Sequence, residues 1–207
     1  MKSLLEYHDL ILCIVSALEA RDPYTSQHSS RVAEMTEALC EYMKVDEERA
    51  EVYHIAAHLH DIGKIGIKDH ILLKDGRLND EEWEIMKSHA EKGYQILINA
   101  DLLSEVAEIV RSHHERYDGK GYPDGLCGQS IHQGARIIAV ADSIDAMMSD
   151  RPYRKGLDKS CCREEIRKNA GIMYDPDVVR AALEHWEDLI ARREDDTHQC
   201  LRQSNLH

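Results

Sequence analysis

Phenylalanine is absent from the 207 residues of this chain, so Leu, Ile, Val, Ala and Met must supply most of its core. Hydrophobic residues make up 43% of the sequence and charged residues 31%, which suits one domain with or without short extensions. The longest apolar run, Leu10 to Leu18, is far shorter than the ~20 residues that a membrane helix needs. Lys2 is the only lysine or arginine before this run, and no small-residue cleavage site follows it. We therefore expect no signal peptide and a cytoplasmic protein.

Cysteine pairs of the CxxC kind are also missing, although the chain has six cysteines. A chain of this size with so few cysteines does not need a disulfide scaffold, so we expect reduced thiols that bind no metal. Positive charge is scarce, because the formal net charge is −13. An acidic protein repels nucleic acid, which argues against general nucleic-acid binding. An anionic substrate would need local positive charge at its site.

No stretch shows the alternation of a β-strand, whereas the 3.6-residue spacing of apolar side chains recurs along the chain. The sequence therefore predicts an all-α fold. Asp46 and Asn79 are expected to cap two of its helices, with Glu82 completing a capping box at the second. The expected helices cover about 4–18, 25–43, 46–60, 79–89, 103–114, 134–148, 159–169 and 176–193, and a glycine-rich loop covers 116–133.

Metal-capable side chains recur in a fixed order, several of them inside the distinctive segments LHDIGK, HHERYDGKGYP and AVADSIDAMMSDRPYR. Five imidazoles and two carboxylates suit one or two divalent transition metals, which indicates a metal-dependent hydrolase. This ligand set favours Fe or Mn, with Zn, Ni and Co compatible and Mg less so. The candidates are His28, His60, Asp61, His89, His113, His114 and Asp142.

Two of these ligand pairs are adjacent in sequence, and neighbours on a regular helix point about 100° apart. His60 and Asp61 are expected at a helix end, where both can face one site, and Asp61 is the candidate bridge between two metals. His54 and His58 are spaced to clamp a metal, but no carboxylate partner is evident, so we expect surface roles for them. Surface positions or satisfied core positions, rather than metal binding, are expected for His8, His70, His132, His185, His198 and His207.

The segments HDIGKIGI, HHERYDGKGYPDGL and DRPYR resemble the HD-GYP domain, a branch of the HD phosphohydrolases. The resemblance extends from about Arg21 to Ala182 and implies a helical HD bundle with extra C-terminal helices and a long glycine-rich GYP loop. We therefore expect an N-terminal helix over residues 1–20, an HD-GYP domain over 21–193 and a polar tail over 194–207. The first helix could pair with that of a second copy, which predicts a homodimer.

The resemblance also implies which residues bind metal. One ion would be held by His28, His60, Asp61 and Asp142, and the other by Asp61, His89, His113 and His114. Some HD-GYP domains bind a third metal through a Glu four residues before the first ligand His. Tyr24 takes that position here and is a poor ligand, so we expect two metals.

HD-GYP domains are similar to one another in hydrolysing cyclic di-GMP, which implies cleavage to pGpG and sometimes GMP by a hydroxide that bridges the metals. Lys64 would contact a phosphate oxygen or help the leaving group. Glu115 and Asp118 are expected to organise the loop or the adjacent histidines. By resemblance, the nucleotide would be bound by Asp145, Arg151, Arg154, Gly121 and Tyr122.

Two other functions are compatible with these motifs. The first is an HD phosphohydrolase that acts on another nucleotide or cyclic dinucleotide. The second is a non-catalytic module that binds cyclic di-GMP, although the full set of candidate ligands argues against it. No receiver, sensor or membrane domain is evident in the sequence, so either the protein acts alone or a protein partner regulates it.

Overall fold

The computed structural model describes residues 4–21, 27–150 and 155–194, and within these ranges every regular element is a helix. The all-α prediction is therefore confirmed. The elements are η1 (Leu4–Tyr7), α1 (His8–Glu19), α2 (His28–Tyr42), α3 (Glu47–Leu59), η2 (Ile62–Gly66), α4 (Asp69–Leu72), α5 (Asp80–Lys87), α6 (His89–Leu97), η3 (Asp101–Leu103), α7 (Ser104–Ser112), η4 (Gly128–Ser130), α8 (Gln133–Met148), α9 (Lys159–Lys168) and α10 (Pro176–Glu184).

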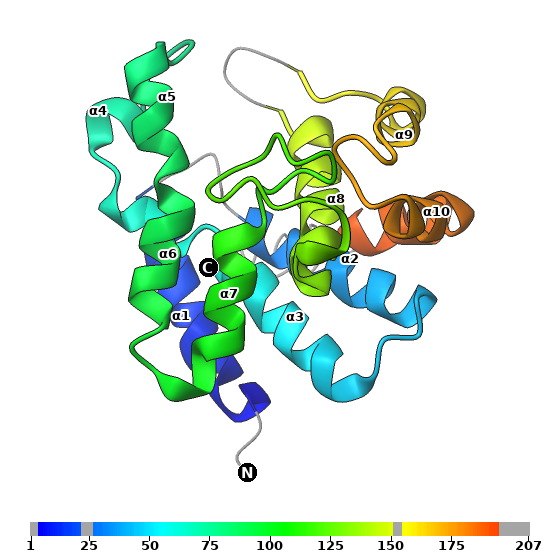
Figure 1. Ribbon diagram of the computed structural model, residues 1–207, viewed down its shortest axis with the longest axis horizontal. Coiled ribbons are helices and arrows are strands. Elements are labelled where there is room, and N and C mark those ends of the chain that lie inside the picture. Colours follow the sequence, from blue (N-terminus) through cyan, green and yellow to red (C-terminus); the bar gives the residue numbers. More distant parts are fainter. Residues whose placement is uncertain (1–3, 22–26, 151–154, 195–207) are drawn as a thin grey trace, which may run out of the picture.

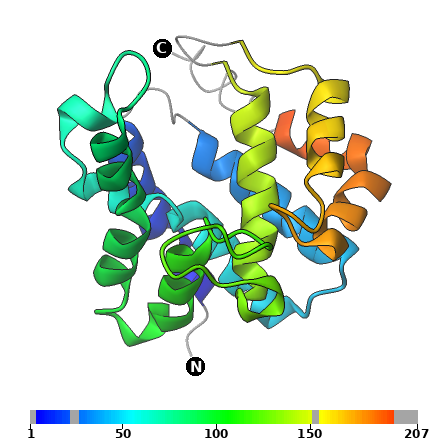
Figure 2. The same ribbon diagram turned by 45° about the horizontal axis from the view of Figure 1, so that its top comes forward.

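Helix α3 lies at the centre of the bundle. It packs against α1, α2 and α7, while α2 also packs against α8 (Figure 1). Helix α6 lies beside α7 and the η2 turn, and α9 and α10 cover the outer side of α8 (Figure 2). The elements on either side of α3 thus come from distant parts of the chain and meet around its C-terminal end.

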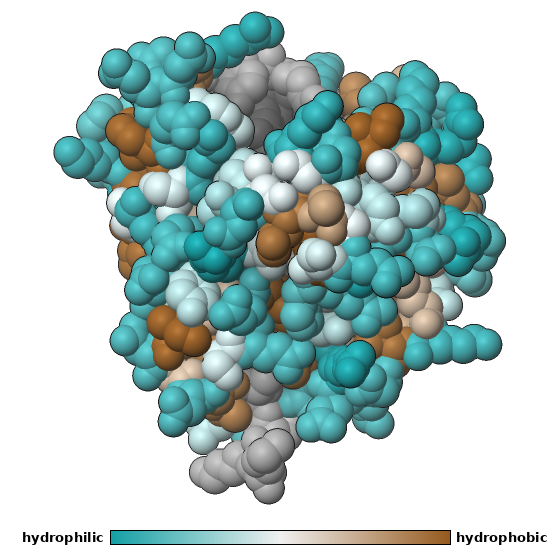
Figure 3. All heavy atoms as spheres, in the orientation of Figure 1, coloured by the Kyte–Doolittle hydropathy of each residue, from teal (hydrophilic) through white to brown (hydrophobic). Residues whose placement is uncertain are grey.

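One continuous hydrophobic core supports this arrangement. Branched aliphatic side chains dominate it, as the lack of phenylalanine requires, and Tyr53 is among the few aromatic residues that are fully buried. Figure 3 shows mainly hydrophilic side chains on one face of the molecule, with hydrophobic ones in small separate patches. Within the described ranges, we find no helix with both the length and the apolar character needed to cross a membrane.

Both predicted helix caps are present. The Asp46 side chain accepts from the backbone N–H of Arg49 at 3.1 Å. Asn79 and Glu82 form a reciprocal capping box, with both hydrogen bonds at 2.8 Å. These short-range signals were readable because each involves residues only three positions apart.

Two predicted helices are each divided in the structure. The helix expected to run from Asn79 through His89 is broken at Ser88, so that His89 begins α6 rather than ending α5. The helix expected over 176–193 is interrupted at His185, where φ is −113° and ψ is 27°, and it resumes over 186–194. Apolar spacing alone does not reveal such breaks, because the pattern continues across them.

The first helix is part of the common core rather than a separate layer. Ile11, Val15 and Leu18 are buried, whereas Leu10 is 61% exposed and Ile14 45% exposed on the outer face. This exposed apolar face is where a second copy would pack, and the homodimer stays a prediction. The predicted tail over 194–207 lies outside the described residues, apart from its first residue.

Candidate metal centre

All seven candidate ligands converge where the core elements meet. Ligand atoms of His28, His60 and Asp142 lie within 4.8 Å of one another and form a first group. Those of His89, His113 and His114 form a second group of the same size. His28 begins α2 and Asp142 lies inside α8, whereas the remaining ligands sit at the start of α6 or just after α3 and α7.

Asp61 lies between the two groups. Its Oδ1 is 3.5 Å from Nε2 of His89 in the second group. Its Oδ2 is 3.4 Å from Nε2 of His60 and 4.0 Å from Nε2 of His28 in the first group. One carboxylate therefore presents a different oxygen to each group, which supports the predicted bridging role of Asp61.

Backbone carbonyls orient three of the imidazoles. Nδ1 of His60 lies 2.7 Å from the Ala57 carbonyl oxygen, and the corresponding contact of His89 with Met86 is 2.8 Å. His113 makes the same contact with the carbonyl three residues before it, at 2.6 Å. A carbonyl oxygen can only accept, so Nδ1 must be the protonated nitrogen and Nε2 keeps its lone pair for a metal.

The nitrogens that face the centre match the donor set of a bound cation. Nε2 of His60 and Nε2 of His113 are buried, and neither has a hydrogen-bond partner among the described residues. An unpaired buried polar atom is costly, and a metal ion bound at each group would satisfy the nitrogen that belongs to it. The histidines and the two carboxylates therefore fit one or two divalent transition metals, in agreement with the sequence.

Burial and charge prepare the ligands electrostatically. Burial lowers the pKa of His114 to about 3 and also holds the pKa of His113 far below its usual value, so both imidazoles are neutral. Burial alone would raise the pKa of Asp61, but the Lys64 ammonium and neighbouring imidazoles outweigh it and hold the pKa well below its usual range. Neutral imidazoles and an ionised carboxylate are the forms that bind metal.

His28 differs from the other ligands because carboxylates flank both of its nitrogens. Nε2 is 3.3 Å from Oδ1 of Asp142, and Nδ1 is 2.7 Å from Oδ2 of Asp145. Burial lowers the pKa of His28, but the hydrogen bonds to these carboxylates overcome that effect and raise it to about 9. Asp145 thus fixes the ring whose other nitrogen faces the centre.

The structure places Asp145, a predicted nucleotide contact, in a buried network of hydrogen bonds. The residue is 0% exposed, and its oxygens accept from His28, from Arg31 at 2.7 Å and from Arg193 at 2.8 Å. Burial would raise its pKa, but the hydrogen bonds from His28 and Arg31 hold the pKa well below its usual range. These bonds orient His28, and because Asp145 also lines the cavity beside the centre, its predicted nucleotide contact stays a prediction.

Lys64 lies in the η2 turn directly beside the centre, and its Nζ is 2.5 Å from Oδ2 of Asp61. The backbone of the turn is held by Arg21, which donates to the Lys64 and Ile65 carbonyls at 3.1 and 2.8 Å. Arg21 also bonds to Asp69 at the start of α4. The end of the first helix thus fixes the segment that carries Lys64.

The loop after α7 closes over the second group of histidines. A Cβ on Gly121 would lie 2.2 Å from the backbone nitrogen of Arg116, so only glycine fits against that segment. The Tyr122 ring lies over His114, with 4.8 Å between ring centroids. As predicted, acidic residues organise the loop: Glu115 accepts from the backbone N–H of Asp124 at 2.7 Å, and Asp118 accepts from Arg116.

The comparisons with known proteins agree with this geometry. An HD domain model matches residues 13–178. A cyclic di-GMP phosphodiesterase of Thermotoga maritima is 43% identical, over 92% of this chain and 54% of that protein. A 3′3′-cGAMP-specific phosphodiesterase of Vibrio cholerae is 38% identical, over 89% of this chain and 36% of that protein. Among solved structures, a cyclic GMP-AMP-specific phosphodiesterase of V. cholerae has a TM-score of 0.68 at 16% identity and covers 86% of this chain and 48% of that one.

This chain belongs to the HD domain family, in its HD-GYP branch. It spans about half of the T. maritima relative and about a third of the V. cholerae relative in length. The solved structure, at 16% identity, shares the fold. The resemblance that the HDIGK and GYP segments predicted is confirmed.

The metal centre of this HD-GYP domain opens into a cavity of about 650 Å³. Lys64, Trp83 and Tyr122 line it together with five of the seven candidate ligands, and so does the segment from Ile71 to Leu78. Trp83 is 47% exposed, and its ring centroid lies 6.3 Å from that of Tyr122. The cavity therefore combines a metal centre, a lysine and two aromatic faces.

Sequence reasoning missed several residues of this cavity. Arg77 lines it, is exposed, and has no ion-pair partner within the described parts of the chain. Trp83 was expected only as a residue of an amphipathic helix. Neither residue lies in a recognisable motif, so the sequence did not indicate that they line a cavity. The predicted nucleotide contacts Arg151 and Arg154, and Tyr24, lie outside the described residues.

Proposed function

We propose that this HD-GYP domain is a metal-dependent phosphodiesterase that hydrolyses cyclic di-GMP. The observation that carries the proposal is the position of Asp61 between two histidine groups at the floor of a cavity lined by Lys64. The relative from T. maritima that is named a cyclic di-GMP phosphodiesterase supports the choice of substrate. The products we propose are pGpG and, after a second cleavage, GMP.

Two divalent ions, Fe or Mn by preference, would be held by the two histidine groups and shared through Asp61. When bound, such ions lower the pKa of water and neutralise charge on a phosphoryl group. His89, His113 and His114 contribute by remaining neutral, because burial lowers the pKa of each ring. The buried walls around His60 and His113 exclude bulk water, which strengthens every electrostatic interaction inside.

Lys64 is the residue proposed to act on the substrate directly. Its ammonium lies at the cavity edge of the centre, where it can donate to a non-bridging phosphate oxygen or to the departing 3′-oxygen. Trp83 and Tyr122 offer faces on which a guanine can stack, and Arg77 offers a guanidinium to the second phosphate. These positive groups offset locally the net charge of −13.

A second candidate substrate is 3′3′-cGAMP, because a V. cholerae relative is named as specific for it. Both cyclic dinucleotides carry the same phosphodiester ring and differ in one base. The stacking faces of Trp83 and Tyr122 accept any base. The choice between guanine and adenine would therefore rest on polar contacts at the base edges.

The proposal is tested by incubating the Mn-loaded protein with cyclic di-GMP, 3′3′-cGAMP and pGpG, and following the products by liquid chromatography and mass spectrometry. We expect conversion of cyclic di-GMP to pGpG. Lys64→Met should reduce kcat about 100-fold or more. Its metal content should not fall below the wild-type level, since the lysine competes with a cation for Asp61. Lys68→Met, an exposed lysine of the same segment, is the matched control and should retain full activity.

Intact cyclic di-GMP beside consumed 3′3′-cGAMP would transfer the assignment to the second substrate. If neither is cleaved but cyclic di-GMP binds in a calorimetric titration, the domain is a binding module. An unchanged kcat in Lys64→Met would remove the proposed role of that residue alone.

A further inference from the structure

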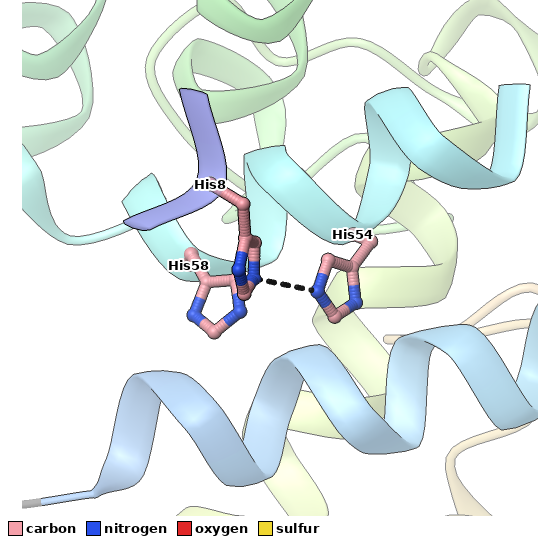
Figure 4. Close-up of side chains that lie close together, drawn as sticks. All are labelled: His8, His54 and His58. Carbon is pink, nitrogen blue, oxygen red and sulfur yellow. Dashed lines mark hydrogen bonds between the residues drawn. The ribbon is translucent and has the colours of Figure 1, made fainter. Parts of the chain in front are cut away.

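Three histidines outside the metal centre meet where the start of α1 lies against α3. His8 is the first residue of α1, and His54 and His58 are one helical turn apart on α3. Figure 4 shows the three rings turned toward one another, with His8 lying beside both of the others. The sequence predicted separate roles for them, because nothing in it shows that α1 returns to this face of α3.

The spacing of these rings is that of a ligand set. Nε2 of His8 is 3.3 Å from Nε2 of His54. The centroid of the His58 ring lies 4.7 Å from that of His54 and 5.2 Å from that of His8. One ligand nitrogen from each of the three lies within 4.8 Å of the others. Two nitrogens bound tetrahedrally to Zn²⁺ at 2.0–2.1 Å would be about 3.3 Å apart.

Burial of the cluster supplies an independent indication that a ligand is accommodated. His58 is only 5% exposed, and its buried Nδ1 has no hydrogen-bond partner among the described residues. Burial lowers the pKa of His54, so its ring keeps a lone pair at neutral pH. An unpartnered nitrogen at such a depth is costly unless something binds it.

A carboxylate lies near Nδ1 of His54. Oε2 of Glu37 on α2 lies 3.5 Å from Nδ1 of His54, on the side away from His8. A carboxylate at Nδ1 favours the tautomer in which Nε2 is unprotonated, as in the carboxylate–histidine–metal arrangement of many zinc sites. Glu37 is thus placed to orient His54 toward its neighbours.

We propose that His8, His54 and His58 form a second metal site, which binds a divalent ion that prefers imidazole nitrogen, such as Zn²⁺. Three imidazoles with an open fourth position are a common ligand set for this ion. The site is distinct from the metal centre: His58 and His60 are two residues apart, or about 200° around the helix, so they point to opposite sides of α3.

A bound ion would pin the start of α1 to α3. His8 lies on α1, whereas the other two histidines lie on α3. A cation that coordinates all three would therefore cross-link positions 8 and 54 of the chain. The far end of α3 leads directly into His60 and Asp61 of the metal centre. The second site would therefore brace the helix that supplies those ligands.

The proposal is tested by equilibrium dialysis of the full chain against Zn²⁺, with metal counted by mass spectrometry. Wild type should bind one Zn²⁺ per chain more than His8→Gln, and His54→Gln should show the same loss. His70→Gln, an exposed histidine of α4, is the matched control and should bind as wild type. Because His8 is outside the metal centre, His8→Gln should keep the wild-type rate with Mn and cyclic di-GMP, should that activity be present.

Amide hydrogen exchange gives a second readout that does not depend on counting. Zn²⁺ should slow exchange in the first turns of α1 in wild type but not in His8→Gln. Equal Zn²⁺ contents in wild type and in both variants would overturn the proposal. The cluster would then be held by an N–H···N hydrogen bond between His8 and His54 alone. This result would leave the proposed phosphodiesterase activity untouched.

Discussion

At the residue scale, the metal centre depends on the group that accepts a hydrogen bond from Nδ1 of each imidazole. Backbone carbonyls do this for three histidines, and no side-chain substitution can remove those acceptors. His28 differs from these three, because its Nδ1 bonds to the Asp145 carboxylate. The orientation of His28 is therefore open to mutation in a way that the orientation of those three is not.

Replacing Asp145 by Asn should loosen His28 and also leave Arg31 and Arg193 without their common counter-charge. Uncompensated buried charge costs about 3 kcal/mol or more, so chemical denaturation should show a loss of that size in the free energy of unfolding. Metal affinity or activity should fall about 10–100-fold. Asp101→Asn, at an exposed position, serves as the control. Wild-type stability in Asp145→Asn would contradict the buried network.

The sequence could group the seven candidate ligands, which the structure brings together, because they sit in short motifs whose letters are unusual. It did not reveal the buried network of Asp145, because the partners that bury this residue are remote: Arg31 is 114 residues away and Arg193 is 48 residues away. Such partners leave no local pattern. The same reason explains the missed cluster, in which His8 precedes His54 by 46 residues.

At the element scale, the η2 turn and α6 approach each other closely beside the centre. A Cβ on Gly63 would lie 1.9 Å from the His89 carbonyl oxygen and 2.5 Å from the Gly93 nitrogen. In the sequence, Gly63 follows the predicted end of the helix over 46–60. In the structure it is also the position that lets two backbones touch, which brings Asp61 within reach of His89.

Gly63→Ala should force η2 and α6 apart, since the atoms that it meets are backbone atoms with little freedom to move. We expect an activity loss of about 100-fold from a displacement of roughly 1 Å, and a stability loss of about 1–3 kcal/mol. Gly66→Ala is the matched control, because its Cβ meets only the flexible side chain of Lys92. Activity assays and thermal melts of both variants decide the point. Equal behaviour of the two would show that the η2–α6 contact is not required.

Most element boundaries followed from the sequence, since caps and apolar spacing are local. The breaks at Ser88 and His185 did not, because each lies within an uninterrupted apolar pattern. At Ser88 the break has a consequence for the site. It lets His89 begin a new helix with its ring bonded to the Met86 carbonyl of the previous one.

At the scale of the whole molecule, the ligands come from elements on both sides of α3, so bound metal ties the bundle together. Ligands that bind only the folded state stabilise it by mass action, about 2.7 kcal/mol at a concentration of 100 times Kd. For a chain of this size we expect a chelator to lower Tm by roughly 5–10 °C, and Mn²⁺ to restore it.

The control for this measurement is Asp61→Asn, whose Tm should respond little to either treatment because the residue shared by both groups is altered. Differential scanning calorimetry provides the values. A full Tm response in Asp61→Asn would contradict the bridging role of Asp61, whatever the variant does to activity.

The second histidine cluster changes how a metal count on this domain must be interpreted. Three ions per chain would match, by number alone, the trinuclear centre expected where a Glu takes the place of Tyr24. Here the same number would arise from two ions on one side of α3 and one on the other. Anomalous scattering at the zinc and manganese edges would locate each ion, and location rather than stoichiometry would tell the two arrangements apart.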